Sequence, residues 1–440
     1  MMKMTTPIVD FIEKYRRSGA LRLHTPGHKG KNILGFEGYD ITELDGADEL
    51  FSPSGIIEES EKNASEIFGV PTYYSAEGSS LCIRAMVYLC SQIRGEKPVI
   101  VAGRNAHKSF IYAAAMTDAD VIFTNPHESD TYLSVTVTAN DVEEAIKSSE
   151  RPVAAVFITT PDYPGKMTEL SGISDVCKKH GALLLVDCAH GAYLHFTENS
   201  PLKYADMCCA SAHKTLPALT GAAYLHVRYP VDARAVKAAM AAFASTSPSY
   251  LILASLDALN PYLTGHKKRL SEFIPKVDEI KERLTADGFE LYGDEPLKIT
   301  VNAAKYGCSG DEISKYLIKK EIYPEYSDNI YITFMITPET EKKGLELLYN
   351  ALSSLPKSAP LDVRPTAVKL PKRIMSVREA FFSAKEILPT QNCAGRILSD
   401  VNISCPPAVC PVVCGELIEE DMIPVLISLK IKELSVIKNP

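Results

Sequence analysis

The sequence predicts an α/β protein whose largest domain is a mainly parallel β-sheet covered by helices. From about residue 58 to residue 267, short apolar runs alternate with segments of helix length. Strands that are apolar along their whole length are typical of parallel sheets buried on both faces. A long charged segment and then a smaller mixed pattern follow. The length of 440 residues accommodates two or three such domains.

The predicted elements follow in order. Residues 8–17 have the apolar spacing of a short amphipathic helix. The segment 171–181 also has helical spacing, and Gly181 supplies its stop. The expected strands of the large sheet are residues 98–103, 119–124, 153–160, 182–187, 207–211 and 222–227.

A second pattern begins after the sheet. Residues 267–286 predict a long charged helix, and a small α+β pattern continues to about residue 355. A linker rich in proline and lysine leads to a separate C-terminal unit. We therefore predict an N-terminal arm (1–35), a major domain (36–266), a small α+β domain (267–356), and a linker with a C-terminal domain (357–440).

Composition excludes several classes of function. Hydrophobic residues make up 46% and charged residues 23%, as in an ordinary soluble protein. The net charge of −8 argues against a nucleic-acid partner and against an anionic membrane surface. No apolar run reaches membrane-spanning length, and the N-terminus lacks the pattern of a signal peptide. We expect a cytoplasmic protein without nucleic-acid or membrane partners.

The eleven cysteines are spread irregularly, which is typical of reduced thiols in a cytosolic protein. Cys393, Cys405, Cys410 and Cys414 cluster near the C-terminus but lack a paired C-x-x-C spacing. We expect no metal site there.

Two strand ends carry groups that suggest cofactor chemistry. Asp187 ends the strand 182–187, at the sheet edge where parallel sheets bind ligands. A carboxylate there needs a cation, such as a protonated pyridine nitrogen, or it caps the next helix. Lys214 follows the strand 207–211, where a desolvated amine can form a Schiff base; the alternative is a solvated loop lysine.

Two further segments carry weaker signals. Residues 76–80 (Ala-Glu-Gly-Ser-Ser) open a helical stretch and could bind an anion at its N-terminus or form an ordinary capping turn. His107 follows the strand 98–103 and could stack on a flat ring or be a loop histidine. Together with Asp187 and Lys214, these segments supply what pyridoxal phosphate needs: anion binding, ring stacking, a pyridinium partner and a lysine.

The chain resembles the ornithine/lysine/arginine decarboxylase family of fold-type-I pyridoxal-phosphate enzymes, which share the aspartate-aminotransferase fold with its three-layer major domain. It is similar to the short form of the family, without the receiver-like wing domain. The segments that carry the resemblance are 23–30 (LHTPGHKG), 40–55 (DITELDGADELFSPSG), 77–80 (EGSS), 103–109 (GRNAHKS), 159–165 (TTPDYPG), 184–196 (LLVDCAHGAYLHF), 211–222 (SAHKTLPALTGA) and 245–258 (STSPSYLILASLDA).

The resemblance implies a pyridoxal 5'-phosphate cofactor and a role for each site residue. Lys214 would form the Schiff base and Asp187 would pair with the pyridine nitrogen, with His213 or Lys214 as proton donor. The remaining implied contacts are His107 and Ala189 on the ring faces, Ser79, Ser80, Ser211 and His213 at the phosphate, Thr246 and Ser247 at the phosphate of a neighbouring subunit in a homodimer or higher oligomer, and Glu325 at the distal cation of the substrate.

The sequence departs from the family pattern at three places. Cys188 stands where the family has Glu, Glu77 where Asn is expected, and residues 405–410 differ from a Tyr-Pro-Pro-Gly-Ile-Pro run. The implied reaction is decarboxylation of arginine, lysine or ornithine to an amine and CO2. Another pyridoxal-phosphate reaction, such as an aminotransferase or carbon–carbon lyase, and a non-enzymatic paralogue are the alternatives.

Overall fold

The computed structural model describes residues 4–401 and 408–438. The chain divides into two compact units. The first comprises residues 1–99, 153–158 and 177–267, and the second comprises residues 100–152, 159–176 and 268–440. The domain boundaries expected at residues 35, 266 and 356 stay a prediction.

A seven-stranded sheet has the strand order β1-β7-β6-β5-β4-β2-β3. All six strands that the sequence predicts are present, and the short β1 is the strand that the apolar pattern did not predict. The strands are β1 (Thr72–Ser75), β2 (Val99–Ala102), β3 (Asp120–Phe123), β4 (Val153–Thr159), β5 (Leu183–Asp187), β6 (Met207–Ala210) and β7 (Ala223–Val227).

The pairing of β5 with β6 is parallel and sets Asp187 opposite Cys209. Every residue of these two strands is buried, which explains why both are apolar except for Asp187 at the end of β5. β7 runs antiparallel to both of its neighbours, β6 and β1. β1 and β7 thus form the antiparallel end of a sheet that is mainly parallel, as predicted.

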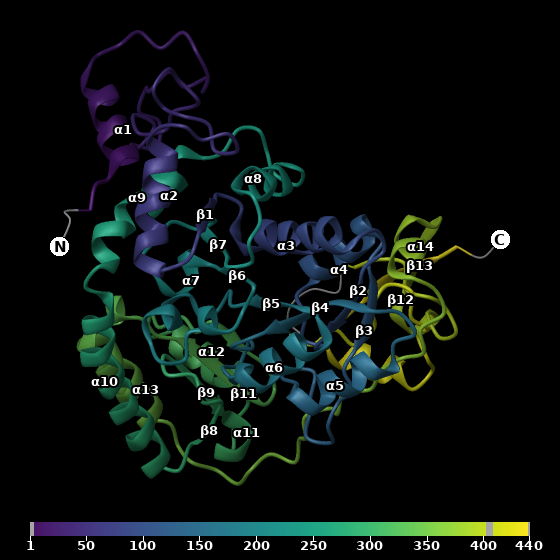
Figure 1. The fold of residues 1–440 in the computed structure, drawn as a ribbon. Helices are drawn as coiled ribbons and strands as arrows, with labels where there is room; N and C mark the ends of the chain where they lie inside the picture. The colour runs from purple at the N-terminus through teal and green to yellow at the C-terminus, as the bar shows by residue number, and fades with distance from the viewer. Residues whose placement is uncertain (1–3, 402–407, 439–440) are drawn as a thin grey trace. The chain divides into compact units, whose positions relative to one another are not determined.

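Three helices of the first unit, α1, α2 and α9, pack around one buried carboxylate. Asp257 on α9 accepts hydrogen bonds from the N–H groups of Ile8 and Val9, both at 2.9 Å, and so caps α1. Burial raises the pKa of Asp257 to about 6. Figure 1 shows α1, α2 and α9 side by side. The helices of this unit are α1 (Pro7–Arg17), α2 (Ile56–Phe68), α3 (Gly78–Arg94), α7 (Ala212–Thr215), α8 (Ala233–Ala241) and α9 (Tyr250–Leu263).

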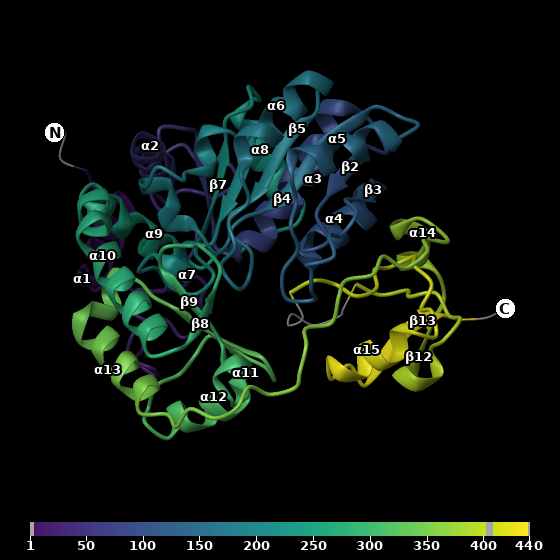
Figure 2. The ribbon, with the colours of Figure 1, turned by 90° about the horizontal axis from the view of Figure 1, so that it is seen from below.

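The second unit contains a four-stranded antiparallel sheet with the order β10-β11-β9-β8. Its strands are β8 (Glu290–Tyr292), β9 (Lys298–Asn302), β10 (Tyr326–Ser327) and β11 (Tyr331–Met335). Figure 2 shows the helices α10 and α13 side by side. Arg283 on α10 joins them through a hydrogen bond to Glu346 on α13 at 2.9 Å. The helices around this sheet are α10 (His266–Ala286), α11 (Ala303–Tyr306), α12 (Gly310–Ile318) and α13 (Glu341–Ser353).

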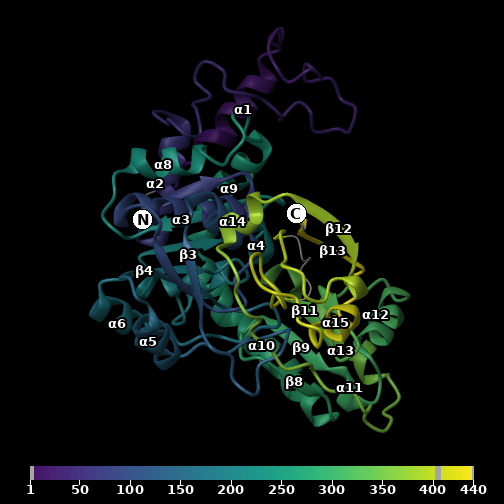
Figure 3. The same cartoon turned by 90° about the vertical axis from the view of Figure 1, so that its right-hand side faces the viewer.

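The C-terminal part of the second unit shares a core with Tyr132 and Val135, which follow β3. Val412, Ile418, Leu426 and Val436 are all fully buried in one cluster. Figure 3 shows β12 and β13 as neighbouring strands, and they pair antiparallel. The elements of this part are α14 (Val377–Phe382), β12 (Lys385–Pro389), α15 (Met422–Ser428) and β13 (Glu433–Ile437).

The remaining helices of the large sheet are α4 (Lys108–Thr117), α5 (Ala139–Ser148) and α6 (Leu170–His180).

Within residues 4–401 and 408–438, the structure contains no helix that is both long enough and apolar enough to cross a membrane.

Candidate active site

Asp187 ends β5 as a buried carboxylate that has no cationic partner among the described residues. Its side chain is only 2% exposed. The N–H of Ala189 donates to its Oδ1 at 3.0 Å, and the thiol of Cys209 lies 3.4 Å from the same oxygen. No lysine, arginine or histidine of the described residues pairs with it. A buried carboxylate in this state is suited to a cation that the chain itself does not supply.

Lys214 lies in the short helix α7, directly after β6. Its Nζ is 2.9 Å from Nε2 of His190, which lies three residues after Asp187. The hydrogen bond therefore joins the turns that follow the parallel neighbours β5 and β6. The sequence analysis quoted His190 within a family segment but gave it no role. Its place in that family segment, in the turn after β5, is the signal that could have singled it out.

The two segments expected to bind phosphate meet in the first unit. Ser211 Oγ donates to Ser79 Oγ at 2.9 Å, and Gly78 N donates to the carbonyl of Gly221 at 2.7 Å. Gly78 has a φ of +70° and Gly221 a φ of +99°, and a Cβ on Gly221 would lie 3.0 Å from the carbonyl oxygen of Ala76. The glycines thus allow the start of α3 to approach the 211–222 segment. The hydroxyls and helix N–H groups gathered here are the kind of donors that an anion site requires.

His213 has a defined hydrogen-bonding role in the 211–222 segment. Its Nδ1 donates to the carbonyl oxygen of Ala222 at 2.9 Å, because a carbonyl can only accept. Burial lowers the pKa of His213, which favours the neutral ring with a lone pair on Nε2. Nε2 can therefore donate a hydrogen bond to a phosphate only when the ring is protonated on Nε2 as well, a state that a nearby anion stabilises.

Glu77 has a partner other than a phosphate. Its Oε1 accepts from the N–H of Ser245 at 2.6 Å. The 245–258 segment therefore begins beside the phosphate loop of the same chain. Thr246 and Ser247, which follow, are exposed.

In the second unit, His107 is the N-cap of α4. Its Nδ1 accepts from the N–H of Ser109 at 3.2 Å, so the neutral ring carries its proton on Nε2. Arg104, three residues earlier, is buried and binds both oxygens of Glu416 at 2.6 Å. It also donates to the carbonyl of Cys410 at 2.8 Å. The sequence analysis missed this contact with the C-terminal segment; Cys405 and the rest of 402–407 lie outside the described residues.

Glu325 is exposed and accepts a hydrogen bond from the hydroxyl of Tyr163 at 3.3 Å. The loop that carries Tyr163 is held by Asp162, whose Oδ1 accepts from the N–H groups of Gly165 at 2.9 Å and Lys166 at 2.6 Å. Burial raises the pKa of Asp162 to about 6. Tyr163 thus brings the family segment 159–165 together with the predicted substrate residue.

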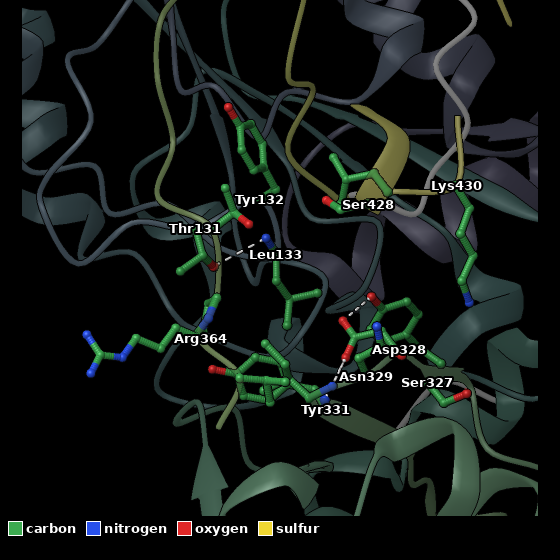
Figure 4. Close-up of a pocket in the computed structure, with 16 residues that line it drawn as sticks. Thr131, Tyr132, Leu133, Ser327, Asp328, Asn329, Tyr331, Arg364, Ser428 and Lys430 are labelled. Atoms are coloured by element: carbon green, nitrogen blue, oxygen red, sulfur yellow. Dashed lines mark hydrogen bonds between the residues drawn. The ribbon is translucent and has the colours of Figure 1, made fainter. Parts of the chain in front are cut away.

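A cavity of about 350 Å³ is lined by the turn that joins β10 to β11 (Figure 4). This turn follows Glu325 in the sequence. Residues 131–133, 363–366 and 428–430 form the other walls of the cavity. The carboxylate of Asp328 accepts from the N–H groups of Ile330 at 2.7 Å and Tyr331 at 2.6 Å, so it stabilises the turn. The sequence analysis predicted no site here.

The residues of the first unit fit pyridoxal phosphate. An unpaired buried carboxylate matches a pyridinium nitrogen, and the hydroxyl pair at the start of α3 matches a phosphate. Lys214 supplies the amine, with an imidazole 2.9 Å from it. Parallel sheets bind ligands at the edge where these groups gather. Fold and site therefore define the class of pyridoxal-phosphate enzymes of fold type I.

Comparison with known proteins agrees. Residues 6–300 match the family described as Orn/Lys/Arg decarboxylase, major domain. An arginine decarboxylase of Halalkalibacterium halodurans is 29% identical over 94% of this chain and 91% of its own length. The structure of the constitutive lysine decarboxylase of E. coli matches 99% of this chain and 82% of its own, with a TM-score of 0.80 and 16% identity. A serine palmitoyltransferase of Sphingomonas wittichii, with a TM-score of 0.58 and 14% identity, covers 80% of this chain and 84% of its own.

The chain belongs to the Orn/Lys/Arg decarboxylase family. It is a pyridoxal-phosphate-dependent amino-acid decarboxylase, which confirms the predicted family, fold class, enzyme class and cofactor. The individual roles of the site residues stay predictions.

Proposed function

We propose that this enzyme decarboxylates a basic amino acid (arginine, lysine or ornithine) to the corresponding amine and CO2. The observation that carries the proposal is the pair of strand ends in the first unit, where Asp187 is buried without a cation and Lys214 lies 2.9 Å from His190. The names of the relatives, an arginine and a lysine decarboxylase, support a basic substrate. Family membership favours decarboxylation over the aminotransferase, lyase and non-enzymatic alternatives.

The cofactor, when bound, supplies an electron sink for the pair that the departing carboxylate leaves at Cα. Lys214 holds the cofactor through its Nζ, and His190 orients that nitrogen. Asp187 keeps the pyridine nitrogen protonated because its carboxylate has no other cation to neutralise.

The other residues bind and move protons. Ser79, Ser80 and Ser211 hold the phosphate together with the first N–H groups of α3. Lys214 Nζ or His213 donates the proton to Cα. His213 can do so only after its Nε2 has been protonated. His107 and Ala189 would bound the two faces of the ring.

We assign Glu325 to the distal cationic group of the substrate. Its carboxylate is exposed, and Tyr163 donates to only one of its oxygens at 3.3 Å. The remaining lone pairs can accept from a guanidinium or ammonium group. A closed site would strengthen this pair because charges interact more strongly when water is excluded.

We also propose a homodimer, in which Thr246 and Ser247 reach the phosphate of the neighbouring subunit, and a cytoplasmic location. Both side chains are exposed, as a contact with a second copy requires. The ten described cysteines are free thiols, which agrees with a reducing compartment.

Product analysis tests the proposed reaction. The purified holoenzyme is incubated separately with arginine, lysine and ornithine, and amine and CO2 are quantified. We expect equal amounts of amine and CO2 from one of the three. Formation of an oxo-acid without CO2 would contradict the proposal.

A further inference from the structure

The two oxygens of the Asp187 carboxylate have different surroundings. Oδ1 accepts a hydrogen bond from the N–H of Ala189 at 3.0 Å and lies 3.4 Å from the Sγ of Cys209. Oδ2 has no hydrogen-bond donor among the described residues. The chain thus satisfies one oxygen of this buried side chain and leaves the other for a ligand.

Cys209 reaches Asp187 because of the register of the large sheet. The strands β5 and β6 run parallel, and Asp187 is paired with Cys209. Side chains of paired residues on neighbouring strands lie on the same face of a sheet. Both side chains are buried, so the contact lies away from bulk solvent. A sulfur-to-oxygen distance of 3.4 Å in such a place is that of an S–H···O hydrogen bond.

The thiol of Cys209 can act only as a donor in this contact. Burial raises the pKa of Cys209 well above its usual range, and the charge of Asp187 raises it further. The thiol therefore keeps its proton at neutral pH, and an ionised carboxylate can only accept it. Because nucleophilic attack and oxidation proceed through the thiolate, the same protonation argues against a reactive cysteine here.

The neighbouring thiols are directed at other groups. Cys208, the preceding residue of β6, points to the opposite face of the sheet, and its Sγ lies 3.7 Å from the carbonyl oxygen of Cys209. Cys82 on α3 is directed at the carbonyl of Gly78, at 3.8 Å. Of these three buried thiols, it is that of Cys209 that donates to Asp187.

We propose that Cys209 is a positioning residue for the cofactor: its thiol holds Oδ1 of Asp187 and so leaves Oδ2 free for the pyridine nitrogen. The inference rests on the proposed pairing of Asp187 with that nitrogen and adds a second group to it. The N–H of Ala189 and the thiol of Cys209 orient the carboxylate before the cofactor binds. A group that is oriented in advance loses less conformational freedom on binding.

The preference of the protein for pyridoxal phosphate over an analogue in which carbon replaces the ring nitrogen measures this pairing. Both compounds carry the aldehyde and the phosphate, so their dissociation constants differ through the ring nitrogen. Equilibrium dialysis of the full-length chain, stripped of cofactor, gives both constants for each variant. A change in packing alone would weaken the binding of both compounds equally and leave the preference unchanged.

Cys209→Ala should reduce the preference by about 5-fold, because a weak donor to a charged acceptor is lost. Cys209→Ser keeps a donor at this position and should retain the wild-type preference. Cys208→Ala, which changes another buried thiol of the same strand, is the matched control and should also retain it. Far-ultraviolet circular dichroism confirms that each variant is folded. A wild-type preference in Cys209→Ala, or a loss in Cys209→Ser as large as in Cys209→Ala, would overturn the proposal.

Asp187→Ala separates failure of this inference from failure of the proposed pairing, and it should abolish the preference. If it does so while Cys209→Ala has the wild-type preference, the carboxylate pairs with the ring nitrogen unaided, and only the role of Cys209 is wrong. If the wild-type chain has no preference, or Asp187→Ala keeps it, the pairing itself is wrong and the role of Cys209 is refuted with it.

Discussion

Arg104 and Glu416 form a buried bidentate ion pair, with both N···O distances at 2.6 Å and side chains that are 1% and 7% exposed. The pair joins the loop after β2 to the C-terminal segment across 312 positions of sequence. Val413 N also donates to Glu416 at 2.6 Å, so the carboxylate is satisfied on both oxygens. The ion pair thus fixes the turn that leads to His107.

Glu416→Gln should destabilise the protein by about 3–5 kcal/mol, because it leaves the buried guanidinium without its counter-charge. Denaturant unfolding of the variant and of wild type at pH 7.5 measures the difference. Arg104→Met combined with Glu416→Leu removes both charges and should recover most of the loss. If the single variant were as stable as wild type, the ion pair would not contribute to the stability of the fold.

Asp187→Asn should retain the cofactor but lower kcat on the order of 100-fold, because the amide cannot keep the pyridine nitrogen protonated. Visible absorbance reports cofactor content, and CO2 release reports turnover. An unchanged kcat would contradict the proposal that Asp187 keeps the pyridine nitrogen protonated.

Glu325→Gln should lower kcat/KM for the basic substrate by about 100-fold and leave cofactor absorbance intact, since a charge-assisted pair with the distal cation is lost. Tyr163→Phe removes only a hydrogen bond to that carboxylate and should cost about 10-fold. Glu282→Gln, an exposed glutamate on α10, is the matched control. Equal losses for an uncharged linear amino acid would count against Glu325 as the distal partner.

His195 should make stability fall in acid. The residue lies in the 3-10 helix Ala192–Phe196 and is partly exposed, but both of its ring nitrogens are buried, and neither has a hydrogen-bond partner in the described part of the chain. Burial lowers its pKa to about 3, whereas an unfolded histidine titrates near 6.5. Below about pH 6.5 the unfolded state therefore binds a proton that the native state does not, and stability falls as pH drops from there toward 3.

His195→Leu removes this proton linkage. Between pH 6.5 and 5 the variant should lose about 2 kcal/mol less unfolding free energy than wild type does. Urea titrations at the two pH values provide the numbers, with exposed His180→Leu as the control. Parallel losses in His195→Leu and wild type would exclude the linkage.

The sequence predicted the parts of the site that follow from strand order. Asp187 ends β5 and Lys214 follows β6, and the parallel pairing of these strands brings the two turns together. The alternation of apolar runs with helices likewise predicted the six strands β2 to β7 of the large sheet. The four-residue β1 was not predicted because its sequence, Thr-Tyr-Tyr-Ser, contains only polar or amphipathic residues.

Contacts between distant segments were not predictable in this way. The bond from His190 to Lys214 depends on the orientation of two turns, and that from Arg104 to Glu416 on how the C-terminal segment folds back. Neither leaves a local pattern, because each half alone looks like an ordinary polar loop residue. The tautomer of neutral His213 could not be predicted from the sequence either, because it is set by the hydrogen bond from Nδ1 to the carbonyl of Ala222.

The role of Lys214 is tested most directly by locating the lysine that holds the cofactor. The purified holoenzyme is reduced with borohydride, digested, and searched by mass spectrometry for the peptide that carries the pyridoxyl phosphate. We predict the label on Lys214, and we predict that Lys214→Ala lacks both the visible absorbance and turnover. A label on another lysine, or a Lys214→Ala variant that still carries a borohydride-reducible cofactor, would contradict the assignment.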